Sequence, residues 1–160
     1  MTNQNSISLS SQWSGTTNLI EIRDLLLQMQ KSASSIRFDG GWSAGKVFAH
    51  CAQSIEYSLH GFPSMKPTLF RMTIGKVVFL IFSLKNKMNH GLETPIPGCE
   101  PLLDPIDLKY GLDRLLKAID SFLNLEEKNL LPHFAYGMLS KKKYDLAHTW
   151  HIKNHMERLI

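Results

Sequence analysis

Apolar side chains recur every three or four positions along most of this chain, which is the period of an amphipathic helix. The first such segment covers residues 17–34. Its apolar stripe consists of Leu19, Ile22, Leu26 and Met29. A second helix is expected after Ser43, a residue that can cap a helix N-terminus, and it ends before Gly61. No segment alternates apolar and polar residues over the length of a strand. The pattern therefore predicts an all-α fold.

The segment at residues 67–84 is apolar on every side, and the run at 77–82 is also rich in β-branched and aromatic residues. Its length and its neighbours favour a helix over a strand. A helix that is apolar all round is either enclosed by other helices or faces a second subunit, and the sequence leaves both open. A homodimer through this segment is one expectation.

A long loop is predicted at residues 89–104, and loops of this length in compact domains often cover a functional site. The pair Asp104-Pro105 suits the start of the next helix, with an N-cap followed by proline at the first helical position. That helix continues with a period of 3.6 as far as Phe122. A last helix is expected to begin at Ser140.

These elements predict one domain over residues 1–160, an antiparallel bundle of four or five helices with a long crossover loop. A poorly ordered segment is expected at residues 1–15, which are rich in Asn, Ser and Gln. With 160 residues, of which 43% are hydrophobic and 20% charged, the chain is long enough to bury one core. The composition excludes a disordered or collagen-like protein.

Charge and cysteine content narrow the expected partners. The net charge of +4 is spread along the chain without a basic, aromatic stripe, so no nucleic-acid partner is expected. The apolar run at 77–82 is far shorter than the roughly 20 residues that span a bilayer, so no membrane partner is expected either. Two cysteines and an N-terminus without a signal-peptide pattern predict a cytoplasmic protein.

Histidines occupy the face of the last helix that should be buried. His148, His151 and His155 project within about 80° of one another, together with Tyr144. His151 and His155 stand one turn apart and can aim two nitrogens at one cation. A third ligand must come from another helix, and His50 is the candidate. Core histidines that bond to backbone or to one another are the alternative.

Four stretches of the chain carry a family resemblance: GWSAGKVFAHCAQSIEYSLHGFP, HGLETPIPGCEPLL, PHFAYGMLS and TWHIKNHMERL. Together they resemble a subfamily of unknown function within the DinB-like superfamily, also called DinB/YfiT-like metalloenzymes. The resemblance implies an antiparallel four-helix bundle that binds a divalent metal through three histidines, here His50, His151 and His155. Relatives commonly have a histidine where this chain has Asn154, and an Arg-Gln pair where it has Glu157-Arg158.

Three imidazoles leave a divalent ion with open positions for water or substrate, as catalytic sites require. Zinc or nickel is the expected metal. The resemblance implies a metal-dependent transferase or hydrolase in which a low-molecular-weight thiol or water is activated toward a small-molecule substrate. No general base is evident from the sequence. Cys51 is expected to be a buried structural thiol, and His148 a residue of the pocket or of the surroundings of the metal.

Two other classes of function remain open at this point. One is a non-catalytic metal-binding or stress-related protein that uses the same three histidines. The other is a helical interaction module whose histidines are polar core residues. Metal content distinguishes the last from the other two, and a substrate screen distinguishes the first two, because a fold does not fix a function.

Overall fold

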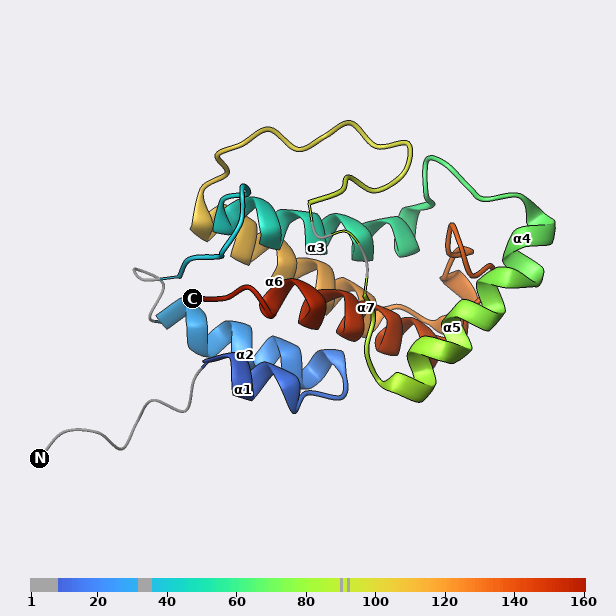
Figure 1. The fold of residues 1–160 in the computed structure, drawn as a ribbon, viewed down its shortest axis with the longest axis horizontal. Helices are drawn as coiled ribbons and strands as arrows, with labels where there is room; N and C mark the ends of the chain where they lie inside the picture. The colour runs from blue at the N-terminus through green and yellow to red at the C-terminus, as the bar shows by residue number, and fades with distance from the viewer. Residues whose placement is uncertain (1–8, 32–35, 90, 92) are drawn as a thin grey trace, which may run out of the picture.

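The computed structural model describes residues 9–31, 36–89, 91 and 93–160. Within these residues the regular elements are helices, and no strand is present, as the sequence predicts (Figure 1). The α-helices are α1 (Leu9–Ser14), α2 (Leu19–Lys31), α3 (Ala44–His60), α4 (Thr68–Met72), α5 (Ile74–Lys85), α6 (Leu108–Asn124) and α7 (Lys141–Met156). A short 3₁₀ helix at Glu127–Asn129 lies between α6 and α7.

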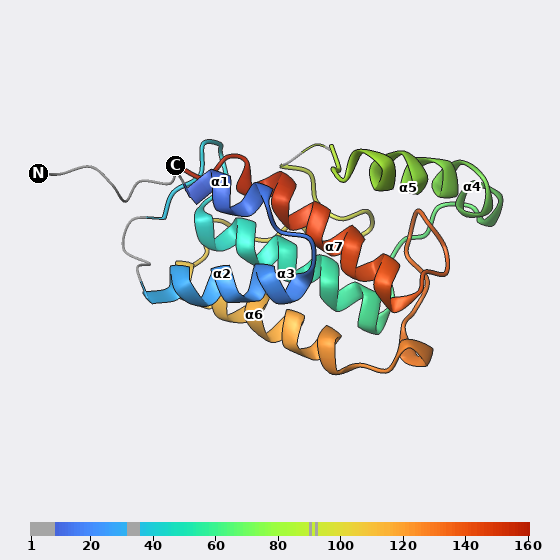
Figure 2. The same ribbon diagram turned by 90° about the horizontal axis from the view of Figure 1, so that it is seen from below.

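The four longest helices, α2, α3, α6 and α7, lie side by side with their axes close to one direction (Figures 1 and 2). Each turns an apolar stripe inward, so that the core lies between them. Ile22, Phe48, Leu115 and Ile152, one from each helix, are fully buried. This packing brings α3 next to α7, the two helices that carry the candidate ligands.

Two predicted caps are present. Ser43 Oγ accepts the backbone N–H of Lys46 at 3.3 Å, and Ser140 Oγ accepts that of Lys143 at 3.3 Å. These bonds satisfy donors that the first turn of a helix leaves open. They also fix where α3 and α7 begin, and therefore which residues of each helix face the core.

The predicted helix start at Asp104 is wrong. The helix α6 begins at Leu108, and the carboxylate of Asp107 caps it by accepting the backbone N–H of Tyr110 at 2.8 Å. The carboxylate of Asp104 instead accepts the backbone N–H of Ser43, at 3.3 Å to each of its oxygens. The contact with Ser43 engages Asp104 away from α6, and the cap is formed three residues later by Asp107.

The segment at residues 67–84 forms two helices rather than one. The helix is interrupted between α4 and α5 at Thr73, whose φ and ψ are −118° and −89°. Of the residues of α5, only Gly75 and Phe79 are buried. Phe79 packs on Tyr136 and Trp150, with ring centroids 5.4 and 5.5 Å apart. The helix thus docks along one narrow side.

Val78 and Phe82 pack partly against the core, but seven other apolar side chains of α4 and α5 form an exposed surface. The alternative in which other helices enclose this segment is therefore wrong. We call this surface the α4–α5 apolar face, and it consists of Leu69, Met72, Ile74, Val77, Leu80, Ile81 and Leu84. It lies at the end of the molecule opposite the C-terminus (Figures 1 and 2). A homodimer through this face stays a prediction.

No helix in the described part of the chain combines the length and hydropathy that crossing a bilayer requires.

The N-terminal region contributes to the core, in contrast to the prediction of poor order over residues 1–15. Residues 9–14 form α1, and Trp13 is only 3% exposed. Lys153 Nζ ties this region to α7 by donating to the carbonyl oxygens of Ser14 at 3.0 Å and Thr16 at 2.8 Å. Residues 1–8 of the predicted segment lie outside the described residues, as do residues 32–34 of the first predicted helix.

Candidate metal site and adjoining cavity

The fold brings His50 of α3 together with His151 and His155 of α7. All three are buried, with 3%, 7% and 3% of their surface exposed. Each offers one ring nitrogen, and these nitrogens lie within 4.8 Å of one another. The three residues that the sequence singles out therefore form one cluster, which could hold a metal ion. We call it the histidine trio.

The spacing within the histidine trio suits a shared cation. His151 Nε2 and His155 Nε2 are 3.2 Å apart. Two imidazole nitrogens, each at 2.0 to 2.1 Å from a tetrahedral zinc ion, would be about 3.3 Å apart. The ring of His50 stands edge-on to both other rings, with centroids 5.1 Å from that of His151 and 5.0 Å from that of His155. The same 3.2 Å also suits a hydrogen bond between the two imidazoles.

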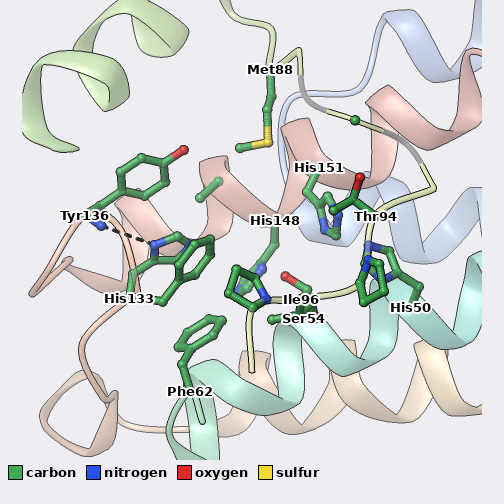
Figure 3. Close-up of a pocket in the computed structure, with 15 residues that line it drawn as sticks. His50, Ser54, Phe62, Met88, Thr94, Ile96, His133, Tyr136, His148 and His151 are labelled. Carbon is green, nitrogen blue, oxygen red and sulfur yellow. Dashed lines mark hydrogen bonds between the residues drawn. The ribbon is translucent and has the colours of Figure 1, made fainter. Parts of the chain in front are cut away.

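A cavity of about 270 Å³ adjoins the histidine trio, and His50 and His151 form part of its wall (Figure 3). Most of the remaining wall is apolar or aromatic, and it includes Phe62, Met88, Ile96, Phe134 and Tyr136. The predicted long loop supplies the segment 94–97 to this wall, in agreement with the prediction that the loop covers a site. A small molecule in the cavity would be within reach of two of the three candidate ligands.

His148 lines the same cavity but does not belong to the histidine trio. Its Nε2 lies 3.2 Å from Ser58 Oγ, which ties α7 to α3 one turn before His151. Burial lowers the pKa of His148 to about 3, so the ring is neutral at physiological pH. It is thus a pocket residue, one of the two roles that the sequence left open.

His133 is a cavity residue that the sequence analysis missed. It stacks on Tyr136 with ring centroids 4.3 Å apart, in a tight loop closed by mutual backbone hydrogen bonds between His133 and Gly137 of 2.9 and 3.0 Å. Burial, and to a smaller extent His148, lowers the pKa of His133 to about 3. The available signal was the position of Gly137, whose φ of 73° favours glycine and allows the chain to turn back.

The chain matches, over residues 13–160, the family described as Protein of unknown function (DUF1569). It belongs to this family. No curated protein and no solved structure matches the chain. The family description names no activity, and the resemblance of this DUF1569 member to the DinB-like superfamily stays a prediction.

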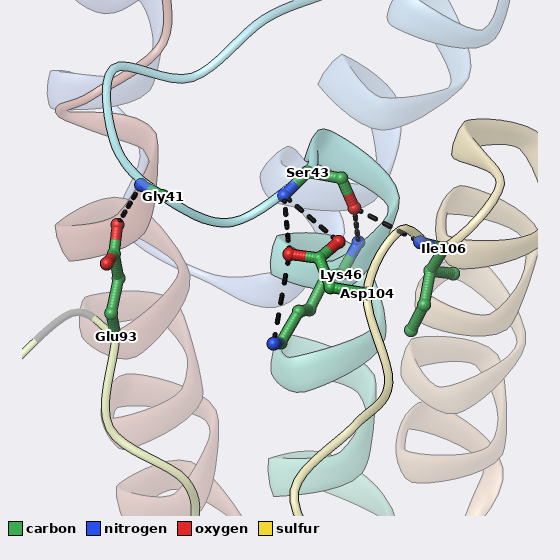
Figure 4. A network of polar contacts seen from close by, with 6 residues as sticks. All are labelled: Gly41, Ser43, Lys46, Glu93, Asp104 and Ile106. Carbon is green, nitrogen blue, oxygen red and sulfur yellow. Dashed lines mark hydrogen bonds and ion pairs between the residues drawn. The ribbon is translucent and has the colours of Figure 1, made fainter.

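In this DUF1569 member the loop that covers the cavity is fixed at both ends (Figure 4). Glu93 Oε1 accepts the backbone N–H of Gly41 at 2.6 Å and pairs with Arg158 at 3.3 Å. At the other end, Asp104 holds the first residues of α3, as described above, and pairs with Lys46 at 3.8 Å. Hydrogen bonding by Ser43 is the main cause that lowers the pKa of Asp104.

Three side chains of α3 that could act as a base or nucleophile, Cys51, Gln53 and Glu56, do not line the cavity beside the trio. Both carboxylate oxygens of Glu56 accept from Arg114 on α6, at 2.9 and 2.6 Å. Cys51 is fully buried, and burial raises the pKa of its thiol, which agrees with a structural role. Gln53 lies outside the wall of the cavity beside the trio. Among the described residues that line this cavity there is no carboxylate.

Proposed function

We propose that this protein binds one divalent metal ion, zinc or nickel, through His50, His151 and His155. The observation that supports the proposal is the convergence of three buried imidazoles from two helices, with their ring nitrogens within 4.8 Å of one another. Imidazole nitrogens are ligands that zinc and nickel prefer, and three of them can hold one divalent ion. We further propose that α2, α3, α6 and α7 constitute the four-helix bundle of the DinB-like superfamily.

The proposed activity is metal-dependent transfer to, or hydrolysis of, a small-molecule substrate. A divalent ion held by three imidazoles keeps open positions and lowers the pKa of a thiol or water that binds there. The chain itself would contribute three functions. His50 and His151 place the ion at the cavity wall, the apolar wall excludes bulk water, and the loop anchored by Glu93 and Asp104 closes the cavity over the substrate.

A non-catalytic metal-binding role is the second candidate, and one observation favours it. The described residues that line the cavity include no carboxylate, and Glu56 is paired with Arg114. His148, which lines this cavity, is a weak base because burial lowers its pKa to about 3. A site of this kind would store or sense a metal ion without turnover.

The experiment that tests the metal site is elemental analysis of tag-free protein purified without chelator. We expect about one zinc or nickel ion per chain in the wild type and none in His50→Ala or His155→Ala. His60→Ala is the matched control, because His60 lies on the same helix as His50 but is exposed. It should keep the full metal content. Wild-type protein that takes up neither metal on titration would refute the proposal.

A second experiment separates the two candidate functions. Metal-loaded wild type and His155→Ala are incubated with a panel of low-molecular-weight thiols paired with electrophiles, and with a panel of esters and amides. Turnover by the wild type alone supports the enzyme. Full metal content without turnover across both panels supports the non-catalytic role.

A further inference from the structure

The cavity beside the histidine trio has walls that are mostly apolar and, within the part of the chain that the structure describes, carry no acidic or basic side chain other than histidine. Apolar or aromatic side chains form most of them, as described above. The side chains with polar atoms, among the described residues, are Ser54, Thr94, Tyr136 and four histidines. None of these lining residues is Asp, Glu, Lys or Arg. Away from His50 and His151, the cavity therefore offers no formal charge to a ligand.

His133 and His148 are the two cavity histidines that do not belong to the trio. Both are neutral at physiological pH because burial lowers the pKa of each to about 3. An ionised ligand group placed between them would lose its hydration without gaining a counter-charge, which costs free energy. An uncharged ligand has no such cost. This part of the cavity thus selects against ions.

His133 nevertheless presents one specific donor. Its Nδ1 accepts the backbone N–H groups of Ala135 at 3.1 Å and Tyr136 at 3.3 Å, so the single proton of the neutral ring must be on Nε2. Within the described part of the chain, Nε2 has no hydrogen-bond acceptor, although the residue is only 7% exposed. Because His133 lines the cavity, a ligand oxygen there can accept a hydrogen bond from this N–H group.

The tautomer of His148 follows from its partner. Ser58 Oγ donates its only proton to the carbonyl oxygen of Ile55 at 2.6 Å, so it accepts from His148 Nε2. His148 therefore keeps an unprotonated Nδ1 and offers the cavity no donor from that atom. Of these two neutral imidazoles, His133 is the one that can hold an acceptor such as a carbonyl oxygen.

The size of the cavity suits about one substituted ring. A cavity of about 150 Å³ lined by aliphatic and aromatic side chains accommodates benzene. The volume here is about 270 Å³, which leaves room for a ring and a short substituent. Figure 3 shows His133 and the His50–His151 pair on different sides of this space, so a ligand held at His133 would extend toward the trio.

We propose that the cavity binds an uncharged monocyclic aromatic molecule whose carbonyl oxygen accepts a hydrogen bond from His133 Nε2. As the assignment of a substrate class, the inference rests on the proposed function. As the assignment of a binding site, it rests on the cavity alone, because its anchor does not belong to the histidine trio.

Three probes of similar size test the two parts of this inference: acetophenone is neutral with an acceptor, ethylbenzene is neutral without one, and benzoate is charged. Dissociation constants are measured by ¹H–¹⁵N NMR titration of wild type and of metal-free His155→Ala. His155 does not line the cavity, so this variant removes the attraction of a metal for benzoate and leaves the wall intact. We expect acetophenone to bind about tenfold more tightly than ethylbenzene, and benzoate to bind most weakly in His155→Ala.

Two variants locate the hydrogen bond. His133→Phe keeps a ring that can stack on Tyr136 but has no N–H donor, so acetophenone should bind no better than ethylbenzene, whose affinity should change little. Thr94→Val removes another polar group of the wall and should leave the preference intact. The inference is wrong if none of the probes binds, if benzoate binds best in metal-free protein, or if the preference survives in His133→Phe.

The outcomes also separate this inference from the metal site. Selective acetophenone binding by a protein that takes up no metal supports the cavity assignment and refutes the proposed function. Full metal content in a protein that does not distinguish acetophenone from ethylbenzene refutes the cavity assignment and leaves the metal site standing.

Discussion

Gly111 of α6 lies directly against Gly45 of α3. A Cβ atom on Gly111 would be 2.1 Å from the carbonyl oxygen of Gly45, and a Cβ on Gly45 would be 2.2 Å from the carbonyl oxygen of Ile106. These neighbours are backbone atoms, which cannot rotate away as a side chain can. The pair therefore sets the distance between α3 and α6, and with it the position of His50, which lies five residues further along α3.

Gly111→Ala should destabilise the protein although alanine is the better helix former. The intrinsic preference for alanine in a helix is worth about 1 kcal/mol, whereas overpacking against a backbone costs about 1 to 3 kcal/mol or more. We expect a net loss in the free energy of unfolding measured by urea denaturation, and weaker metal binding because α3 must shift. Gly15→Ala is the control, since its nearest atom would be 3.8 Å away. Equal stability of Gly111→Ala and wild type would contradict this account.

Metal binding should raise the melting temperature, because the ion binds the folded histidine trio and not the unfolded chain. At a free metal concentration 100-fold above the dissociation constant, the stabilisation is about 2.7 kcal/mol. Differential scanning calorimetry with zinc, with nickel and with chelator measures it. His50→Ala should melt at the same temperature in all three conditions, whereas His60→Ala should respond like the wild type. A zinc-dependent shift that persists in His50→Ala would place the metal elsewhere.

Acid should destabilise the protein partly through His133. Its pKa is lowered from 6.5 to about 3 in the folded state, so between these values the unfolded chain binds a proton that the native protein does not. The free energy of unfolding is therefore complete above about pH 6.5 and falls with decreasing pH by about 1.4 kcal/mol per pH unit for this one group. Urea denaturation in chelator between about pH 7 and pH 5 measures the slope. His133→Asn should lower this slope by about one proton, and an unchanged slope would show that His133 titrates normally.

The α4–α5 apolar face should mediate a homodimer. Exposed apolar patches of this extent usually mark an interaction surface. Size-exclusion chromatography with light scattering should give twice the chain mass of 18.2 kDa for the wild type and the single mass for Leu80→Asp. Leu103→Asp is the control, because Leu103 is 87% exposed but lies in the loop before α6. Wild-type protein with only the 18.2 kDa mass would refute the dimer.

Local signals were sufficient for several features of the fold. The apolar period of 3.6 predicted the helical class, and the side chains of Ser43 and Ser140 predicted where α3 and α7 begin. These features depend on groups within a few residues of one another, which the sequence displays directly. The sequence did not predict that Asp107, rather than Asp104, caps α6. This outcome depends on a contact between Asp104 and Ser43, which are far apart in the chain.

The sequence by itself determined which residues can act as ligands: a one-turn pair, His151 and His155, on a buried stripe, with His50 as the third candidate. Only the tertiary structure decided that the three meet, because the approach of α3 to α7 is set by packing across many residues far apart in the chain. The tertiary structure also decided that α5 exposes most of its apolar side chains and that His133 lines the cavity. Helical periodicity states which side of a helix is apolar, but the surface that covers that side belongs to other parts of the chain.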